Sequence, residues 1–313
     1  MNNVKIEKIN YSNYGECVRL SNSIIEAVIT LDCGPRIIRF SFIGKDNFMF
    51  EDIDRVVNNK SEAVEAVFGK GSQWYIYGGH RIWLSPEDMP LSYYPDNEKV
   101  ICNKIENGVE IIAPVQRVNE VQYRFEIIMN AEKPKLEINH YVTNTGYNTR
   151  NNSIWCLTVL DKGGLEVIPQ PLYDTGLLAN RVLSLWPYAD MSDERVYFGK
   201  KYITLKQDKD TNSAFKFGIN NIRNFAAYFN HDSLFIKKYN CNPDGKYPDY
   251  GTSFETYTNN HFIEMETLGE LTDITPGSTA FHGEQWELVD NVARPDAKDE
   301  VTIDALVKVY IEK

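Results

Sequence analysis

The sequence predicts an all-β protein, built as a large antiparallel β-sandwich with few short helices. Short runs of β-branched and aromatic residues recur along the chain, and such runs are typical of strands. Helical periodicity is rare, and many strands with few helices favour a sandwich or barrel over an α/β fold. The chain has 313 residues, 42% of them hydrophobic, so it can bury a large core.

The expected strands are short and follow one another along most of the chain. The run 135–142 alternates most clearly, with Leu136, Ile138 and Val142 on one face. The other expected strands are residues 24–30, 109–113, 124–129, 201–207, 225–229, 233–239, 254–258, 262–267, 285–289 and 306–311. One helix is expected at residues 61–68, with Ser61 as its N-cap.

Two stretches are predicted to be long loops. Residues 73–96 are rich in Gly, Trp, Tyr and Pro, and residues 240–252 contain Pro243-Asp244-Gly245. Long loops within a compact β protein are more often functional than idle. No Ser/Gly run, Pro-rich tract or block of like charge suggests a linker, so residues 1–313 are expected to form a single domain.

Charge and cysteine content argue against several classes of partner. The net charge of −11 makes nucleic acid and anionic lipid poor partners. The five cysteines form no CxxC pair, and the first residues lack the apolar core of a signal peptide. A cytoplasmic, soluble protein without a membrane span is therefore expected. No phosphate loop or dinucleotide fingerprint is present, so no cofactor is expected.

The segment around Glu264 and Glu266 is the most informative one for chemistry. In an extended strand these two carboxylates lie on one face, about 7 Å apart, with Met265 on the opposite face. Two carboxylates on one face repel each other, which raises the pKa of one of them unless a cation lies between them. Such a carboxylate can act as a general base. The alternative is a solvated strand face with two hydrated glutamates.

Three motifs in a fixed order resemble the galactose mutarotase (aldose 1-epimerase) superfamily. Met265-Glu266-Thr267, followed by the Pro276-Gly277 turn, looks like the strand that carries the catalytic base there. The segment 136–146, ending in Asn-Thr-Gly, is similar to the mid-chain strand and turn of the superfamily. The segment 78–83, Gly-Gly-His-Arg-Ile-Trp, is similar to the Gly-Gly segment that borders the sugar site in the hexose-phosphate branch. The resemblance implies a galactose mutarotase-like sandwich, with Glu266 as the catalytic base.

The chain departs from the family pattern at one position. Mutarotases place a catalytic histidine shortly after the Asn-Thr-Gly turn, to protonate the ring oxygen, but residues 151–164 contain no histidine. His80 is the leading candidate for a replacement acid, because it lies in an aromatic, Gly-rich segment and titrates near neutral pH. Its alternative role is to cap a loop carbonyl.

Further candidates could bind a substrate. Arg81 and Arg36 present guanidinium donors for a hydroxyl, carboxylate or phosphate, and Arg36 has a surface ion pair as its alternative role. Trp83 offers a flat face of the kind on which sugars stack. The remaining candidates are carboxylates, namely Glu264, Glu255 and Asp249. A metal held by Asp249, Glu264 and Glu266 is an open alternative, but no spacing requires one, and no metal site is predicted.

Three functions therefore remain open, and the expected partner is a small-molecule sugar or sugar derivative. The first is an aldose 1-epimerase-like isomerase that uses Glu266 at the anomeric centre, with His80 or a water as the acid. The second is a carbohydrate-binding protein that lacks catalysis, which the missing histidine favours. The third is a glycan hydrolase or lyase on the same fold. The sequence indicates no particular sugar and no oligomeric state.

Overall fold

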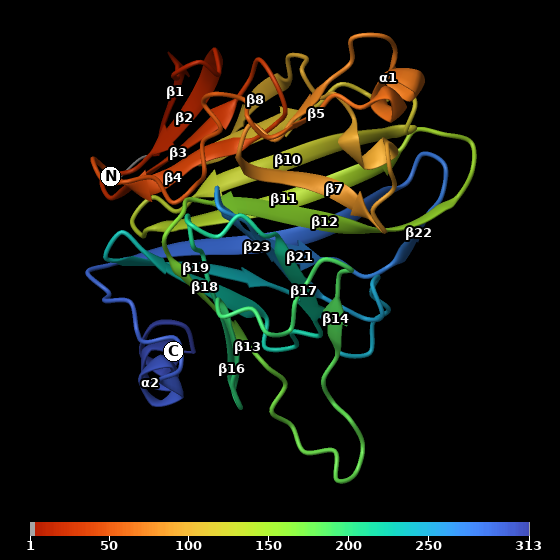
Figure 1. The fold of residues 1–313 in the computed structure, drawn as a ribbon. Helices are drawn as coiled ribbons and strands as arrows, with labels where there is room; N and C mark the ends of the chain where they lie inside the picture. Colours follow the sequence, from red (N-terminus) through yellow and green to blue (C-terminus); the bar gives the residue numbers. More distant parts are fainter. Residues whose placement is uncertain (1–3, 313) are drawn as a thin grey trace.

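A computed structural model describes residues 4–312 of the chain. Its main feature is a pair of large antiparallel sheets that lie face to face, with two short helices at the periphery (Figure 1). Sheet 1 contains, in spatial order, β1 (Lys5–Asn10), β2 (Glu16–Ser21), β3 (Ile25–Thr30), β4 (Ile37–Phe42), β7 (Gly79–Ser85), β12 (Arg150–Leu160), β21 (Ile263–Leu268), β20 (Phe254–Thr258), β17 (Phe215–Ile219) and β14 (Leu183–Leu185), with β22 (Thr272–Ile274) paired to β12.

Sheet 2 lies behind sheet 1 in the view of Figure 1. It contains, in spatial order, β15 (Val196–Phe198), β16 (Tyr202–Lys206), β13 (Leu165–Pro169), β18 (Phe225–Asn230), β19 (Ser233–Tyr239), β23 (Thr279–Asp290), β11 (Lys135–Asn144), β10 (Val121–Met129), β9 (Gly108–Ile112) and β8 (Ile101–Ile105). The remaining elements are β5 (Asn58–Asn59), β6 (Trp74–Tyr75), α1 (Glu62–Phe68), the 3-10 turn η1 (Leu91–Tyr93) and α2 (Glu300–Tyr310).

The main hydrophobic core lies between the two sheets. Phe40 of sheet 1 packs against Trp286 of sheet 2, with ring centroids 5.6 Å apart, and Phe235 contacts both rings. Because side chains alternate along a strand, each core residue sets the direction of its neighbours. On β21, Ile263 and Met265 belong to this core, so Glu264 and Glu266 point to the outer face of sheet 1.

The predicted fold class is confirmed: the protein is mostly β, with two large antiparallel sheets and short helices. One predicted strand is wrong, because residues 306–311 belong largely to helix α2. Asp299 caps this helix by accepting a hydrogen bond from the Thr302 amide, and Ile303 and Val307, four residues apart, are its buried positions.

One local prediction is corrected and one is confirmed. The loop predicted at residues 73–96 contains β7, a central strand of sheet 1, because Gly79–Ser85 is buried along its whole length. Helix α1 occurs where it was predicted, with Ser61 at its N-cap, although the Ser61 side chain makes no capping hydrogen bond. Within residues 4–312, no helix has the length and apolar character needed to cross a membrane.

Candidate functional site

The outer face of sheet 1 brings together charged and aromatic side chains from five neighbouring strands. Their direction follows from alternation, because Ile82, Cys156 and Phe217 point into the core between the sheets. The neighbours of these core residues therefore point outward. The outward side chains of this group, called the outer cluster below, are Arg81 and Trp83 on β7, Trp155 on β12, Glu264 and Glu266 on β21, Glu255 on β20 and Lys216 on β17.

A buried lysine lies at the centre of the outer cluster. The Lys216 ammonium is 2.8 Å from Glu266 Oε2 and 2.9 Å from Glu255 Oε2. Trp155 Nε1 donates a second hydrogen bond to the same oxygen of Glu266, at 2.8 Å. The ammonium also lies 4.5 Å and 4.6 Å from the ring centroids of Trp155 and Trp186, which adds cation–π attraction. One cation is thus shared by two carboxyl groups inside an aromatic wall.

A second ion pair lies beside the first. Arg81 Nη1 is 3.1 Å from Glu264 Oε1, and both side chains are nearly buried. The Arg81 guanidinium lies over the rings of Trp83 and Trp74, at 4.6 Å and 5.5 Å from their centroids. Trp83 in turn packs against Trp155, so the two ion pairs share one aromatic floor.

Burial perturbs the titration of these groups. Burial raises the pKa of Glu255 to about 8, although Lys216 opposes the rise. Burial likewise raises the pKa of Glu264 to about 7, against the effect of Arg81. Burial alone would lower the pKa of Lys216, but Glu266 and Glu255 raise it above its usual value. Near neutral pH the outer cluster therefore contains a lysine cation together with protonated carboxyl groups.

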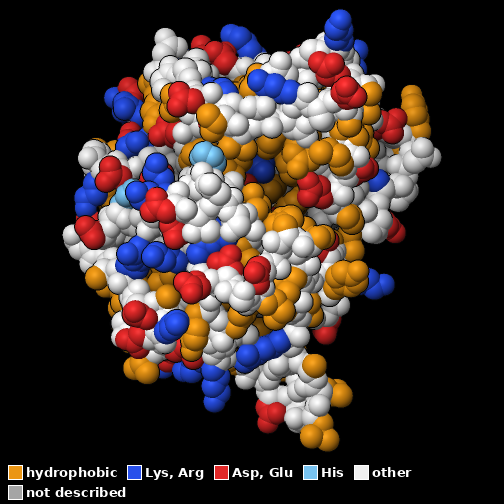
Figure 2. Space-filling model, viewed as in Figure 1, with side chains coloured by type: hydrophobic (Ala, Val, Ile, Leu, Met, Phe, Trp, Pro, Cys, Tyr) orange, Lys and Arg blue, Asp and Glu red, His pale blue; other side chains and the backbone are white. Residues whose placement is uncertain are grey.

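Two polar atoms of the outer cluster, Glu266 Oε1 and Arg81 Nε, have no hydrogen-bond partner among the described residues, and neither has Nε1 of Trp74, a β6 residue that packs against Trp83. A buried polar atom left without a partner costs about 1–3 kcal/mol, so native proteins contain few of them. Figure 2 shows a hollow on this face, over the region of β7, with hydrophobic side chains around it and a Lys or Arg side chain at its bottom. The outer cluster and the adjacent Trp74 thus offer an acceptor and two donors that a polar ligand could satisfy.

The predicted loop at residues 240–252 borders the same face. Asp249 Oδ2 lies 3.5 Å from the hydroxyl of Ser85, at the end of β7. Thr252 donates a hydrogen bond to Glu255 Oε1 at 3.1 Å. This loop therefore supplies Asp249 at the edge of the outer cluster and holds Glu255 in place.

The structure separates the predicted site residues into two groups. Glu266, Glu264, Glu255, Arg81 and Trp83 lie together in the outer cluster, and Asp249 lies at its edge.

The other two predicted residues, His80 and Arg36, lie elsewhere. His80 precedes Arg81 on β7 and therefore points inward; it is fully buried between the sheets and cannot contact a ligand on the outer face. Arg36 is buried rather than on the surface: its Nη1 is 2.6 Å from Asp96, and its guanidinium lies 5.8 Å from the Tyr77 ring.

Sequence reasoning missed Lys216, Trp155 and Trp186. Lys216 had a detectable signal, because it stands between Phe215 and Phe217 in a short β-type run, which predicts a lone cation opposite an apolar strand face. Nothing local indicated that this cation would meet Glu266. That contact depends on β17, β20 and β21 being neighbours.

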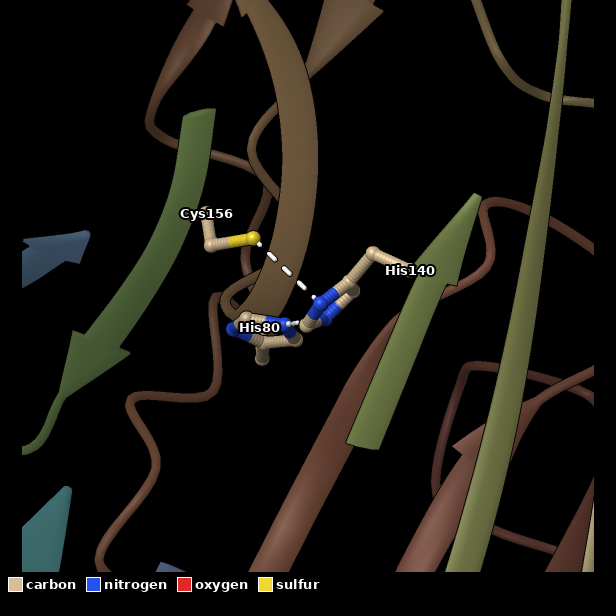
Figure 3. Close-up of side chains that lie close together, drawn as sticks. All are labelled: His80, His140 and Cys156. Atoms are coloured by element: carbon tan, nitrogen blue, oxygen red, sulfur yellow. Dashed lines mark hydrogen bonds between the residues drawn. The ribbon is translucent and has the colours of Figure 1, made fainter. Parts of the chain in front are cut away.

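The inner side of sheet 1 contains a second polar group, called the inner cluster below. Figure 3 shows His80, His140 and Cys156 within it. His140 Nδ1 donates to the His282 carbonyl at 2.9 Å, so its Nε2 accepts from His80 Nε2, 2.8 Å away. His80 Nδ1 then accepts from the Thr158 hydroxyl at 2.9 Å. Hydrogen bonding thus fixes the neutral tautomers of both histidines.

Lys237 supplies the positive charge of the inner cluster. Its ammonium is 2.9 Å from Glu284 Oε1, and it also donates to Thr158 Oγ1 and to the carbonyl oxygens of Cys156 and Met265. Burial alone would raise the pKa of Glu284, but Lys237 and the three histidines lower it well below its usual value.

Two inner-cluster triads have the residue types of a metal site. Among the described residues, these triads are His80, His140 and Cys156, and Cys156, His282 and Glu284. Both ring nitrogens of His80 and of His140 are already engaged in hydrogen bonds, and the Lys237 ammonium already contacts Glu284. Burial also raises the pKa of the Cys156 thiol well above its usual value, so the metal-binding thiolate is disfavoured. The donor set therefore does not fit a metal in this arrangement. Neither triad contains Asp249, Glu264 or Glu266.

Comparison with known proteins gives matches of structure rather than of sequence. No family model and no curated protein matches the chain. A galactose mutarotase-like protein from Clostridium acetobutylicum is similar in structure, with a TM-score of 0.55 and 10% identity, over 93% of this chain and 100% of that one. A galactose mutarotase-like protein from Lactobacillus casei gives a TM-score of 0.51 and 11% identity, over 87% and 100%.

A TPR-domain containing protein from Parabacteroides distasonis gives a TM-score of 0.58 and 10% identity. The match includes 90% of this chain and 49% of that protein, so this chain spans about half of that protein's length. Together with the two facing antiparallel sheets, these similarities identify the architecture: the chain has the galactose mutarotase-like fold.

Proposed function

We propose that this protein acts on a sugar as an aldose 1-epimerase-like isomerase, with Glu266 as the general base at the anomeric centre. The observation that carries the proposal is the environment of Glu266. Lys216 and Trp155 hold one of its carboxylate oxygens, while its other oxygen, buried at the outer face, has no partner among the described residues. A carboxylate fixed in this way is oriented to accept a proton from a bound hydroxyl group.

The acid of the reaction is Glu264 in this proposal. Ring opening removes the proton of the anomeric hydroxyl, breaks the bond between the anomeric carbon and the ring oxygen, and gives that oxygen a proton. Glu264 lies on the same face of β21 and has a pKa of about 7, so a large share of it is protonated at neutral pH. Glu255 suits this role less well, because its two oxygens already contact Thr252 and Lys216.

The aromatic floor and the free donors suit a sugar as the ligand. Trp83 and Trp74 offer flat apolar faces, and Arg81 Nε and Trp74 Nε1 are donors without partners among the described residues. The similarity in fold to galactose mutarotase-like proteins agrees with a sugar substrate.

Exchange NMR on anomer interconversion tests the proposal. The rate of anomer exchange is measured for a panel of aldoses and hexose phosphates with the wild-type protein, with Glu266→Gln and with Glu137→Gln. Glu137→Gln is a matched change at an exposed glutamate on sheet 2. We expect the wild-type protein to accelerate anomer exchange of at least one sugar. This acceleration should fall about 10²- to 10⁴-fold in Glu266→Gln and be retained in Glu137→Gln. Acceleration that survives in Glu266→Gln would contradict the assignment of the base.

A second candidate function is carbohydrate binding without catalysis. It is favoured by the close hold of Lys216 and Trp155 on a fully buried Glu266, which suits a fixed acceptor as well as a base. Chemical shift changes on sugar addition, without faster anomer exchange for any sugar of the panel, would support this function instead.

A further inference from the structure

The two sheets end at the same side of the sandwich, and their inner faces are uncovered there. On the edge strand β14, Leu183 pairs with Ile219 and Leu185 with Phe217, so both leucines share the inward face of those core residues. They are nevertheless 40% and 36% exposed. The core surface of sheet 1 therefore continues past the point where sheet 2 covers it.

The edge of sheet 2 shows the same feature. On β15, Phe198 pairs with the core residue Ile203 and shares its inward face, yet it is 38% exposed. A cavity of about 190 Å³ lies between the two edges, and Leu183, Phe198, Ile203 and Ile219 are among its lining residues. An apolar cavity of about 150 Å³ can hold a benzene-sized group, so this one has room for a leucine side chain.

The segment 171–182, called the arm below, connects β13 to β14 beside this cavity. Figure 1 shows it as a green loop that extends away from both sheets. It presents Leu177 and Leu178, which are 103% and 77% exposed, and Leu172 and Tyr173 are exposed as well. Figure 2 shows hydrophobic side chains at its outer end. Exposed apolar side chains in such a cluster mark an interaction surface.

Charge and shape indicate a second copy of this chain as the partner. The protein carries a net charge of −11, which opposes self-association, but the arm contains one acidic residue, Asp174, and one basic residue, Arg181. The arm is thus neutral within an acidic protein. A protruding leucine pair and an apolar cavity occur on one surface, side by side, which is the self-complementary arrangement that a twofold interface requires.

We infer that the arm and the open end of the sandwich form the interface of a twofold dimer. Leu177 and Leu178 of each copy cover the partner's exposed edge leucines and enter its cavity, and the second copy does the same in return. The closed symmetry leaves neither arm free, so the assembly stops at two chains. This inference is independent of the function proposed for Glu266.

Sedimentation velocity over a range of protein concentrations tests the inference. The variants are Leu177→Asp combined with Leu178→Asp on the arm, Leu183→Asp at the open end, and Tyr147→Asp as a control on the exposed turn between β11 and β12. We expect the wild type and Tyr147→Asp to sediment as dimers. The arm variant and Leu183→Asp should sediment as monomers, with half that mass. Circular dichroism checks that each variant folds, and the arm variant keeps the inference testable because both leucines are exposed.

Three results would overturn the inference. A wild-type protein that stays monomeric at the highest concentration means that the arm serves another partner. A dimer that persists in the arm variant means that the copies meet through another surface. A control variant that dissociates as fully as the arm variant means that the loss is not specific to the arm.

Discussion

The two sides of sheet 1 each bury a lysine against glutamate, and they differ in how charges and hydrogen bonds are balanced. In the inner cluster, Lys237 forms an ion pair with Glu284, and both oxygens of the Glu284 carboxylate accept hydrogen bonds, from the Thr267 hydroxyl and from Trp286 Nε1. In the outer cluster, Lys216 is shared between Glu255 and Glu266, and Glu266 Oε1 is left without a partner. A balanced network stabilises a core, whereas an incomplete one is suited to binding a ligand.

The difference has a structural basis in the strands themselves. Lys237 donates to the carbonyl oxygens of Met265 and Cys156, which lie on the strands that carry Glu266 and Trp155 on their other side. The inner cluster therefore supports the outer cluster from behind. Substitutions on the two sides should separate stability from function.

The largest effect is expected for Lys237→Met. Removing this cation leaves the buried Glu284 carboxylate without its ion-pair partner, which costs about 3–5 kcal/mol of unfolding free energy. Urea unfolding followed by fluorescence measures the loss. Combining Lys237→Met with Glu284→Gln should recover part of it, because the unpaired charge is then removed. Equal stability of the single variant and the wild type would show that the inner cluster is not structural.

The next largest effect is expected from acidification. Burial lowers the pKa of His140 and His282 to about 4 and that of His80 well below 6.5. The unfolded chain therefore binds more protons, and stability is lost as the pH falls from about 6.5 towards about 4. Between pH 6.5 and 5.5 the loss is about 1 kcal/mol per histidine. Urea titrations at both pH values test this, and His140→Gln should show a smaller loss.

A smaller effect on stability, with a large effect on function, is expected for Lys216→Met. Of the two carboxyl groups that Lys216 contacts, Glu255 is largely protonated near neutral pH, because its pKa is about 8, and Glu266 keeps its hydrogen bond from Trp155 when the cation is removed. The unfolding free energy should therefore fall by only about 1–2 kcal/mol. Anomer exchange, where the wild type accelerates it, should fall about 100-fold, because Glu266 loses the cation that orients it. A loss of stability as large as that of Lys237→Met would remove the distinction between the two clusters.

The smallest effect is expected at the edge of the outer cluster. Asp249 has a φ of 50°, a conformation that asparagine tolerates, so Asp249→Asn keeps the loop unstrained. Sugar affinity should fall about tenfold, as for the loss of one hydrogen bond to a charged group, with stability unchanged. NMR titration measures the affinity, and Asp244→Asn in the same loop is the control. An unchanged affinity would place Asp249 outside the binding surface.

The strands and helices show how much of the fold a local residue pattern predicts. Residues 135–142 alternate between apolar and polar residues, and they form β11 as predicted. Helix α2 was missed because its apolar residues after Leu306 resemble a short strand, while its capping residue, Asp299, lies well before them. Strand β7 was missed because Gly, Trp and Pro around it are typical of loops, although here they pack in the middle of a sheet.

The local residue pattern also predicts only part of the candidate site. Alternation along β21 was sufficient to place Glu264 and Glu266 on one face. The same rule applied to β7 separates His80 from Arg81, but it required recognising β7 as a strand.

By itself, the sequence determined the fold class and the faces of individual strands, because alternation is a local property with a period of two residues. The order of strands in sheet 1 brought Lys216 between Glu255 and Glu266, and the packing of sheet 2 against sheet 1 placed Lys237 of β19 behind them. Those contacts join distant segments, 50 residues apart for Lys216 and Glu266 and 81 residues apart for Lys237 and Cys156. Which strands become neighbours depends on the packing of the whole chain, so only the tertiary structure decided them.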